Sequence, residues 1–372
     1  MAKRKTIALL IFKYFPYGGL QRDFLEIAQE LLKRNINIKV LTGSWEGERP
    51  PHLDIEELDA RGLTNHAKNI NFYKKANNVL KKIKPDLVFG FNKMPGLDVY
   101  LAADTCFKFF SRRKNLLYKL LPRYKAFIDY ETEVFGRGSK TKALILNKKQ
   151  EKEFSLEYET DKSKLVLIPP GLPTDWKREI ESNDFRKGLN INDSSTLLLF
   201  VGSDFQRKGL DRAIKSLSYC SELRKEEIYL IVAGDDNESS CLKLANQLGI
   251  SNKVIFLGPR DDIAEIMSSC DLLIHPAREE AAGNVIIESL ISELPILTCE
   301  AVGFSSYVEE YSAGKVIPEP FDQKDLDNSL ISMINNLELN SFKKNLSGLK
   351  NDNYFFSRFE FVGDFIEREL YG

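Results

Sequence analysis

Short apolar runs alternate with segments of helical periodicity through most of this chain. Runs of this length are typical of strands that are buried on both faces of a parallel sheet, and the segments between them are typical of the covering helices. The expected strands are residues 7–12, 38–42, 87–91, 165–168, 196–201, 228–233, 254–257, 272–274 and 296–298, and the first expected helix is 20–33. The pattern predicts an α/β protein whose ligands bind at the carboxyl ends of the strands.

The chain has 372 residues, which is too long for one ordinary core and suits two domains. Its net charge of −1 hides an asymmetry, because residues 1–170 carry an excess of Lys and Arg and the remainder an excess of Asp and Glu. The sequence Pro169-Pro-Gly171 follows an expected strand and marks a break. We therefore expect one domain at 1–168, a second at 169–350, and a helix at 351–372.

The stretch 275–295 contains the best candidate for a ligand site. A polar loop follows the strand 272–274, and a helix is expected at 284–292 with Asn284 as its N-cap. The first N–H groups of a helix lack partners and attract anions, and Gly283 would let a phosphate approach them closely. The expected anion-binding residues are Ala282, Gly283, Asn284 and Val285.

Two carboxylates flank this anion site. Glu280 lies in the loop, and Glu288 lies one helical turn beyond Asn284. Carboxylates suit sugar hydroxyls rather than phosphates, so the order indicates ribose at Glu288, diphosphate at the helix start and hexose at Glu280. The alternative is an ordinary strand–loop–helix unit with two solvated glutamates.

Two further cations follow the expected strand 196–201. Arg207 and Lys208 lie between Gly202 and Gly209, at the carboxyl end of a strand. They could neutralise a diphosphate leaving group in place of a metal ion, whereas an Arg–Lys pair in another context is only surface. No spacing of His or Cys indicates a metal site, and Asp325-Leu-Asp327 falls in a polar helical stretch, so we expect no metal.

Several longer motifs carry a family resemblance. They are Lys13-Tyr-Phe-Pro-Tyr-Gly-Gly-Leu-Gln-Arg-Asp23, Ser44-Trp-Glu-Gly47, Gly90-Phe-Asn-Lys-Met-Pro-Gly-Leu-Asp-Val-Tyr100 and Gly202-Ser-Asp-Phe-Gln-Arg-Lys-Gly209, and Glu280 and Glu288 add E-x7-E spacing. From about Ile7 to its end the chain resembles the lipopolysaccharide core glucosyltransferase I family, which are retaining glycosyltransferases of family 4.

The resemblance implies a GT-B fold, in which two Rossmann-like domains face a central cleft and a C-terminal helix crosses back to the first domain. It also implies transfer of glucose from UDP-glucose to an inner-core heptose of lipopolysaccharide, with retention of configuration. No cofactor besides the donor substrate is expected.

Candidate residues also follow strands in the first half. Gly18 and Gly19 precede the helix 20–33 and would let backbone approach the donor phosphate. Asp23 could bind an acceptor hydroxyl or merely complement the helix dipole. The resemblance places Asp23 and Asp104 at the substrate site, and with Glu280 they are the expected catalytic residues. Many relatives have a histidine in the region of Asp104, so the residue that takes the acceptor proton stays open.

The segment 108–125 contains seven cations and no acid, interleaved with leucines and aromatics. A basic amphipathic stretch is typical of membrane-surface binding, with nucleic acid or a plain solvated helix as alternatives. No RNA-binding motif accompanies it, so we expect an anionic membrane surface and no nucleic acid. Pro122 is expected to break the run. The expected membrane-facing residues are Lys108, Arg112, Arg113, Lys114, Lys119 and Arg123.

No apolar run approaches the roughly 20 residues of a membrane span, and the five cysteines are scattered. A cytoplasmic protein, peripheral on the cytoplasmic face of the inner membrane, is therefore expected.

Three other functions remain open: a nucleotide-sugar transferase with another hexose or acceptor, a GT-B nucleotide-sugar epimerase, and a basic binding module without catalysis. The residues alone leave the donor sugar, the acceptor linkage and the base-binding groups undetermined.

Overall fold

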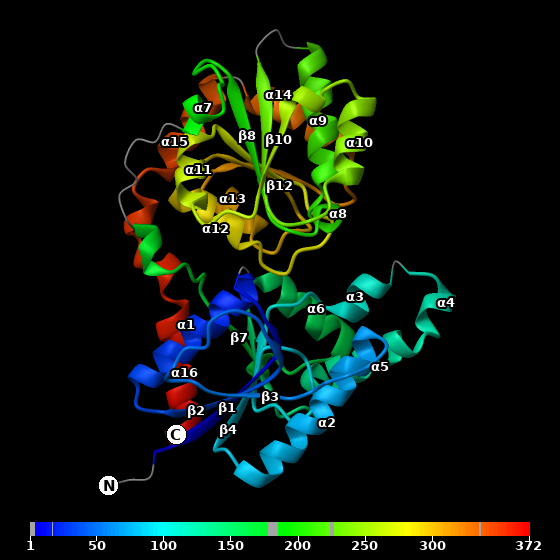
Figure 1. Ribbon diagram of the computed structural model, residues 1–372, viewed down its shortest axis with the longest axis vertical. Coiled ribbons are helices and arrows are strands. Elements are labelled where there is room, and N and C mark those ends of the chain that lie inside the picture. Colours follow the sequence, from blue (N-terminus) through cyan, green and yellow to red (C-terminus); the bar gives the residue numbers. More distant parts are fainter. Residues whose placement is uncertain (1–3, 17, 113, 178–184, 224–226, 335) are drawn as a thin grey trace. The chain divides into compact units, whose positions relative to one another are not determined.

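The computed structural model of the protein describes residues 4–16, 18–112, 114–177, 185–223, 227–334 and 336–372. The chain separates into two compact units, of which the first contains residues 1–171 and 356–372 and the second contains residues 172–355. Each unit has a parallel sheet with helices on it (Figure 1). The chain leaves the first unit just after the expected break at Pro169 and returns to it just after residue 350.

The first unit contains a seven-stranded sheet in the order β3-β2-β1-β4-β5-β6-β7. All of its neighbouring strands are parallel, and Ile7 of the central strand pairs with Ile38 on one side and Leu87 on the other. The strands are β1 (Thr6–Tyr14), β2 (Asn37–Trp45), β3 (Asp54–Glu57), β4 (Leu87–Gly90), β5 (Val99–Ala102), β6 (Lys142–Ile145) and β7 (Leu165–Leu167). The helices are α1 (Gly19–Lys33), α2 (Asn65–Ile83), α3 (Phe107–Ser111), α4 (Leu116–Lys119), α5 (Pro122–Phe135), α6 (Lys148–Tyr158) and α16 (Arg358–Tyr371).

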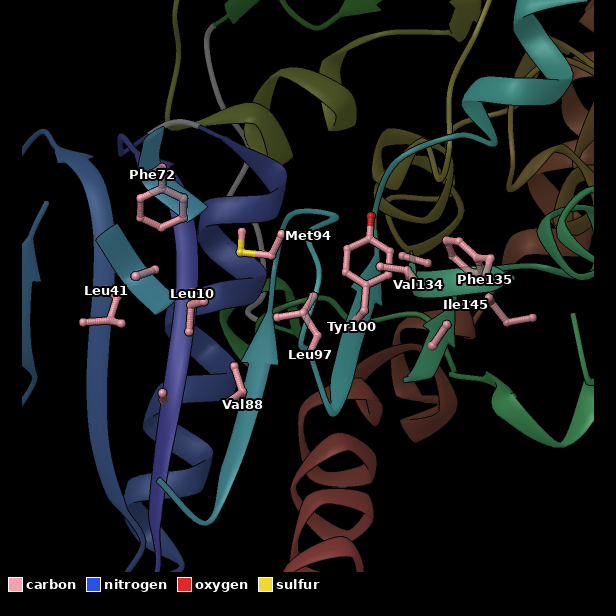
Figure 2. Close-up of a cluster of buried hydrophobic side chains, with 14 of the residues drawn as sticks. Leu10, Leu41, Phe72, Val88, Met94, Leu97, Tyr100, Val134, Phe135 and Ile145 are labelled. Atoms are coloured by element: carbon pink, nitrogen blue, oxygen red, sulfur yellow. The ribbon is translucent and has the colours of Figure 1, made fainter. Parts of the chain in front are cut away.

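One face of this sheet forms a buried apolar cluster with α2, α5 and α6 (Figure 2). Leu10, Val88 and Tyr100 contribute to it from three neighbouring strands, and Phe72 and Phe135 come from α2 and α5. Because successive side chains of a strand point to opposite faces, Ile7 and Leu9 are buried on the other face.

The C-terminal helix α16 packs on α1 in the first unit. Arg34, which ends α1, forms ion pairs of 2.7 Å with Asp364 and 2.9 Å with Glu367 of α16. Lys142 at the start of β6 pairs with Glu369 at 2.6 Å. These contacts confirm that the aromatic-rich C-terminal segment returns to the first domain.

The second unit contains a six-stranded sheet in the order β10-β9-β8-β11-β12-β13. Its strands are β8 (Thr196–Val201), β9 (Ile228–Ala233), β10 (Val254–Gly258), β11 (Leu272–His275), β12 (Ile296–Cys299) and β13 (Gly314–Ile317). Its helices are α7 (Phe185–Gly188), α8 (Phe205–Lys208), α9 (Leu210–Leu223), α10 (Ser239–Gln247), α11 (Ile263–Ser269), α12 (Asn284–Ile291), α13 (Ser305–Glu310), α14 (Gln323–Met333) and α15 (Asn336–Leu346). Two parallel sheets of this kind confirm the predicted fold class.

The basic segment differs from the single interrupted helix that its spacing suggested. It contains α3, α4 and the start of α5, and Pro122 occupies the first turn of α5, where a missing N–H is harmless. In the polar helical stretch that contains Asp325 and Asp327, Asp327 is not simply solvated. It accepts hydrogen bonds from Ser216 and Gln323.

Candidate active site

The loop between β11 and α12 holds both candidate carboxylates of the second unit. Its helix begins differently from the expectation, because the N-cap is Gly283 and Asn284 is the first helical residue. Gly283 has a φ of 84°, a left-handed conformation that glycine adopts without strain. A β-carbon there would approach Cγ1 of Val302 to 2.6 Å. Glycine at this position thus sets both the turn and its close packing.

Residues 280–283 are fixed on the neighbouring segment 302–304. Glu280 forms a parallel bridge with Val302, and its carbonyl accepts the N–H of Gly303 at 3.0 Å. The carbonyl of Ala282 accepts the N–H of Phe304 at 2.8 Å. The backbone that leads into α12 is therefore positioned before any ligand arrives.

The structure brings Arg207 and Lys208 to Glu280, although they lie 73 and 72 positions from it in the sequence, respectively. Nη1 of Arg207 lies 3.4 Å from Oε2 of Glu280, and the ammonium of Lys208 contacts the same oxygen. The short helix α8 positions both cations, because its N-cap Asp204 accepts the N–H of Arg207 and pairs with its guanidinium at 2.7 Å. Two cations and the Glu280 carboxylate thus meet within the loop.

The ammonium of Lys208 lies in an unusual electrostatic environment. Burial and the neighbouring Arg207 charge lower the pKa of Lys208 to about 7. The negative charges of Asp204 and Glu288 raise the pKa of Lys208 in part, so Glu288 interacts electrostatically with the ammonium. The contact with Glu280 also opposes the shift, because a carboxylate stabilises the charged form. An incoming phosphate would favour the ammonium in the same way.

Glu288 is largely buried on α12, one turn beyond the helix start. The residues between Glu280 and Glu288 include the first N–H groups of α12, which carry partial positive charge. The order of carboxylate, helix start and carboxylate predicted from the sequence is therefore present within one unit.

His275 is a residue near this site to which sequence reasoning gave no role. It ends β11 and is fully buried, and within the described structure neither ring nitrogen has a hydrogen-bond partner. Burial, Lys208 and Arg207 lower its pKa well below the usual value, so the imidazole is neutral. Its place at the end of the expected strand 272–274 was the available sequence signal, and its proximity to Lys208 and Arg207 appears only in the structure.

The remaining candidates belong to the first unit. Gly18 is the N-cap of α1 and Gly19 its first residue, so the helix begins one residue earlier than expected. Asp23 is buried, and its carboxylate pairs with Arg358 at 2.6 Å. The structure therefore gives Asp23 a partner inside the unit, and its role toward an acceptor stays a prediction.

Asp104 follows β5 and is exposed. One of its carboxylate oxygens lies 3.4 Å from the hydroxyl of the buried Tyr100. Asp104 lines a pocket of about 300 Å³ within the first unit.

The expected membrane-facing cations divide into two groups. Arg112 pairs with Glu157 at 2.6 Å, and Lys108 lies 3.9 Å from the same carboxylate and 4.6 Å above the ring of Tyr158. Lys114, Lys119 and Arg123 are exposed, and Arg113 lies outside the described residues. Between them are four exposed leucines, of which Leu116 is 81% exposed: Leu116, Leu117, Leu120 and Leu121.

None of the helices in the described ranges is long and apolar enough to cross a bilayer. Among the same residues, no group of three or more His, Cys, Asp or Glu side chains is placed to hold a metal ion.

Comparisons with known proteins agree with this arrangement. Residues 17–176 match the family model described as Glycosyltransferase Family 4, and residues 181–346 match the model described as Glycosyl transferases group 1. Over 333 residues the chain is 39% identical to the lipopolysaccharide glucosyltransferase WaaG of Escherichia coli (strain K12), covering 87% of this chain and 88% of the relative.

Solved structures extend the likeness to the fold. A crystal structure of WaaG superposes with a TM-score of 0.92 at 37% identity, covering 97% of this chain and 99% of the other. Sucrose-phosphate synthase from Thermosynechococcus elongatus superposes with a TM-score of 0.81 at 15% identity and 99% coverage of both chains, a likeness of fold alone. The chain belongs to the lipopolysaccharide glucosyltransferase family of GT-B glycosyltransferases.

Proposed function

We propose that this protein transfers glucose from UDP-glucose to an inner-core heptose of lipopolysaccharide, with retention of configuration and without a metal ion or other cofactor. The proposal rests chiefly on the meeting of Arg207 and Lys208 with Glu280 at the loop that leads into α12. Family membership supports glucosyl transfer. A protein of similar fold, Anabaena Alr3699/HepE, has been crystallised with UDP-glucose, and this supports the choice of donor.

The donor would bind along the order of groups in the second unit. Glu288 accepts the ribose hydroxyls, the N–H groups at the start of α12 bind the diphosphate, and Glu280 accepts hydroxyls of the glucose. Without donor, Glu280 is held by Lys208. When the donor enters, Lys208 and Arg207 exchange this carboxylate for the diphosphate, and Glu280 becomes free to accept hydroxyls of the glucose.

In the reaction, the bond between the glucose C1 and the β-phosphate oxygen breaks, and a heptose hydroxyl oxygen bonds to C1 on the same face. The acceptor proton passes to the departing phosphate oxygen. Negative charge accumulates on the leaving UDP, where Arg207 and Lys208 stabilise it without reorganisation. Both cations bind the diphosphate in the ground state and stabilise it more strongly as negative charge accumulates, and this additional stabilisation raises turnover.

The acceptor is a lipid, so the protein must work at a surface. We propose that α4 and its flanking residues bind the anionic cytoplasmic face of the inner membrane. The exposed Leu116, Leu117 and Leu120 would insert shallowly, and Lys114 and Lys119 would attract anionic headgroups.

A transfer assay tests the proposed reaction. Purified protein is incubated with labelled UDP-glucose, UDP-galactose, UDP-N-acetylglucosamine and ADP-glucose, each with lipopolysaccharide truncated at the inner-core heptose. We expect label only from UDP-glucose and an α-linked product by NMR. Transfer of a different hexose, or interconversion of a nucleotide sugar without acceptor, would contradict the proposal.

A further inference from the structure

His275 is a buried polar side chain to which the donor site proposed above gives no role. It is the last residue of β11, where it pairs with Thr298 of β12, and its carbonyl accepts the hydroxyl of Thr298 at 2.9 Å. The side chain is fully buried, and its ring lies 6.1 Å from the ring of Phe200 in β8. The imidazole therefore lies near the carboxyl ends of three neighbouring parallel strands, the edge at which open α/β sheets bind ligands.

The residues that follow His275 are bound directly to α8. The N–H of Arg278 donates to the carbonyl of Arg207 at 2.7 Å, and the guanidinium of Arg278 donates to the carbonyl of Gln206 at 2.6 Å. These contacts place the end of β11 beside the short helix that carries Arg207 and Lys208. Both cations act on the imidazole, because their charges add to the effect of burial in lowering the pKa of His275.

The two nitrogens of this ring can form hydrogen bonds that the protein alone does not supply. A neutral imidazole has one N–H donor and one acceptor nitrogen. Within the described residues, neither nitrogen of His275 has a hydrogen-bond partner. Buried polar atoms are almost always paired, and an apolar side chain would fill this position without the free-energy cost of burying two unpaired nitrogens. This cost, borne beside two cations, indicates that the ring is used when the donor is bound.

The ammonium of Lys208 is the neighbouring group that needs an acceptor. Its side chain is only 14% exposed. The charged groups that act on it are Arg207 and Asp204 of α8, Glu280 of the loop and Glu288 of α12. When Glu280 turns to the glucose hydroxyls, the ammonium loses its carboxylate. A second carboxylate would neutralise the ammonium, whereas a neutral imidazole accepts a hydrogen bond and leaves the positive charge available to the diphosphate.

We propose that His275 is a positioning residue for the donor diphosphate. When Lys208 exchanges Glu280 for the diphosphate, the acceptor nitrogen of His275 receives a hydrogen bond from the ammonium and holds it at the phosphate. The inference rests on the proposed function and adds one residue to its donor site. The bound ammonium then has an anion and a neutral acceptor as partners, so its position is fixed and its charge acts on the diphosphate.

The pH dependence of UDP binding tests this role. Affinity is measured by calorimetry between pH 6 and pH 9.5, without acceptor, for wild type and His275→Phe, which removes both nitrogens and keeps a planar ring. We expect His275→Phe to weaken UDP binding about ten-fold at pH 6, because the bound ammonium loses a charge-assisted hydrogen bond. The difference from wild type should narrow as the pH rises and Lys208 loses its proton. Proton uptake on UDP binding at pH 8 should fall for the same reason.

Three further variants separate this role from packing. His275→Gln keeps a neutral acceptor and should retain most of the wild-type affinity and its pH dependence. His52→Phe makes the same change as His275→Phe at an exposed histidine of the first unit, and it should bind UDP as wild type does. In a Lys208→Arg background the cation stays charged throughout, so His275→Phe should weaken UDP binding equally at every pH. Tm is measured for each protein, and His275→Met supplies the apolar change if His275→Phe does not fold.

The results that would overturn the inference are distinct from a failure of the proposed reaction. Unchanged UDP affinity in His275→Phe, a loss that is equal at every pH, or an equal loss in His275→Gln would show that the ring only packs. If wild type transfers no glucose to a heptose-terminated acceptor but His275→Phe shows the pH-dependent loss of UDP affinity, the proposed reaction is wrong and the role of His275 at the diphosphate stands.

Discussion

Nη1 of Arg358 donates a hydrogen bond of 2.6 Å to Oδ2 of Asp23, and both side chains are almost fully buried, at 0% and 3% exposure. This pair joins α16 to α1 across 335 residues of sequence. Nε of Arg358 also donates to the carbonyl of Pro169 at 3.1 Å, just before the chain leaves the first unit. A β-carbon on Gly171 would meet the Arg358 side chain, so the glycine is required there.

We expect Arg358→Met to lower the free energy of unfolding of the first unit by about 3–5 kcal/mol, because it leaves the Asp23 carboxylate buried without its cation. Arg368→Met, which removes an exposed arginine from the same helix, is the control and should have little effect. Thermal and urea unfolding provide the measurement. Adding Asp23→Asn to Arg358→Met should recover part of the loss, and a purely additive result would show that the pair is not coupled.

Glu288 and Glu280 should separate nucleotide binding from sugar binding. Glu288→Ala is expected to weaken UDP binding about ten-fold or more, because charged hydrogen bonds to ribose contribute roughly 1.5–3 kcal/mol. Glu280→Ala should spare UDP, since it frees Lys208 for the phosphate, and should impair the use of UDP-glucose. Calorimetry with UDP alone decides the matter: an unchanged affinity in Glu288→Ala would remove the ribose assignment.

Arg207 and Lys208, the two cations proposed to neutralise the diphosphate, should make the enzyme independent of metal ions. Turnover should persist in excess EDTA and should fall by roughly two to three orders of magnitude in Arg207→Ala or Lys208→Ala, the usual effect of removing a transition-state donor. The substituted protein should still bind UDP-glucose, which shows that the substitution removes transition-state stabilisation and leaves the donor site folded. Activity abolished by EDTA and restored by Mn²⁺ would show instead that a metal neutralises the diphosphate.

The lowered pKa of Lys208 predicts proton uptake on donor binding. Above pH 7 the free lysine is increasingly neutral, and a bound diphosphate favours the ammonium and raises its pKa, so UDP binding at pH 8 should take up a fraction of a proton and weaken as pH rises. Calorimetry in buffers of different ionisation enthalpy measures this uptake. Lys208→Arg keeps its charge at every pH of the experiment and should abolish it. Equal uptake in both proteins would assign the proton to another group.

Membrane binding should depend on α4 and its flanking residues. Lys114→Ser with Lys119→Ser is expected to weaken co-sedimentation with phosphatidylglycerol vesicles about ten-fold or more, since an anionic leaflet attracts each nearby cation. Leu116→Ser with Leu117→Ser should weaken it further by removing apolar insertion. High salt should release the wild-type protein.

The vesicle control removes two exposed cations elsewhere in the first unit, Arg137→Ser with Lys162→Ser. This variant should bind as wild type does. Equal binding of wild type to neutral and anionic vesicles would mean that α4 is only a solvated surface.

Local periodicity was sufficient to locate most strands of the two sheets. The expected strands 196–201 and 228–233 coincide with β8 and β9, and the expected helix 284–292 differs from α12 by one residue at its end. The N-cap was wrong, because a left-handed glycine ends the loop one residue before Asn284. In the basic segment, the break expected at Pro122 falls between α4 and α5, and α4 is too short for periodicity to define it.

The sequence by itself determined the parallel α/β architecture and the order of Glu280, helix start and Glu288, because these depend on neighbours within one strand–loop–helix unit. Only the tertiary structure decided that Lys208 contacts Glu280, that Asp23 is buried against Arg358, and that Asp104 shares a pocket with Arg123. These pairs come from separate elements, and their proximity depends on strand order and helix packing. A local pattern of apolar and charged residues does not specify either of these.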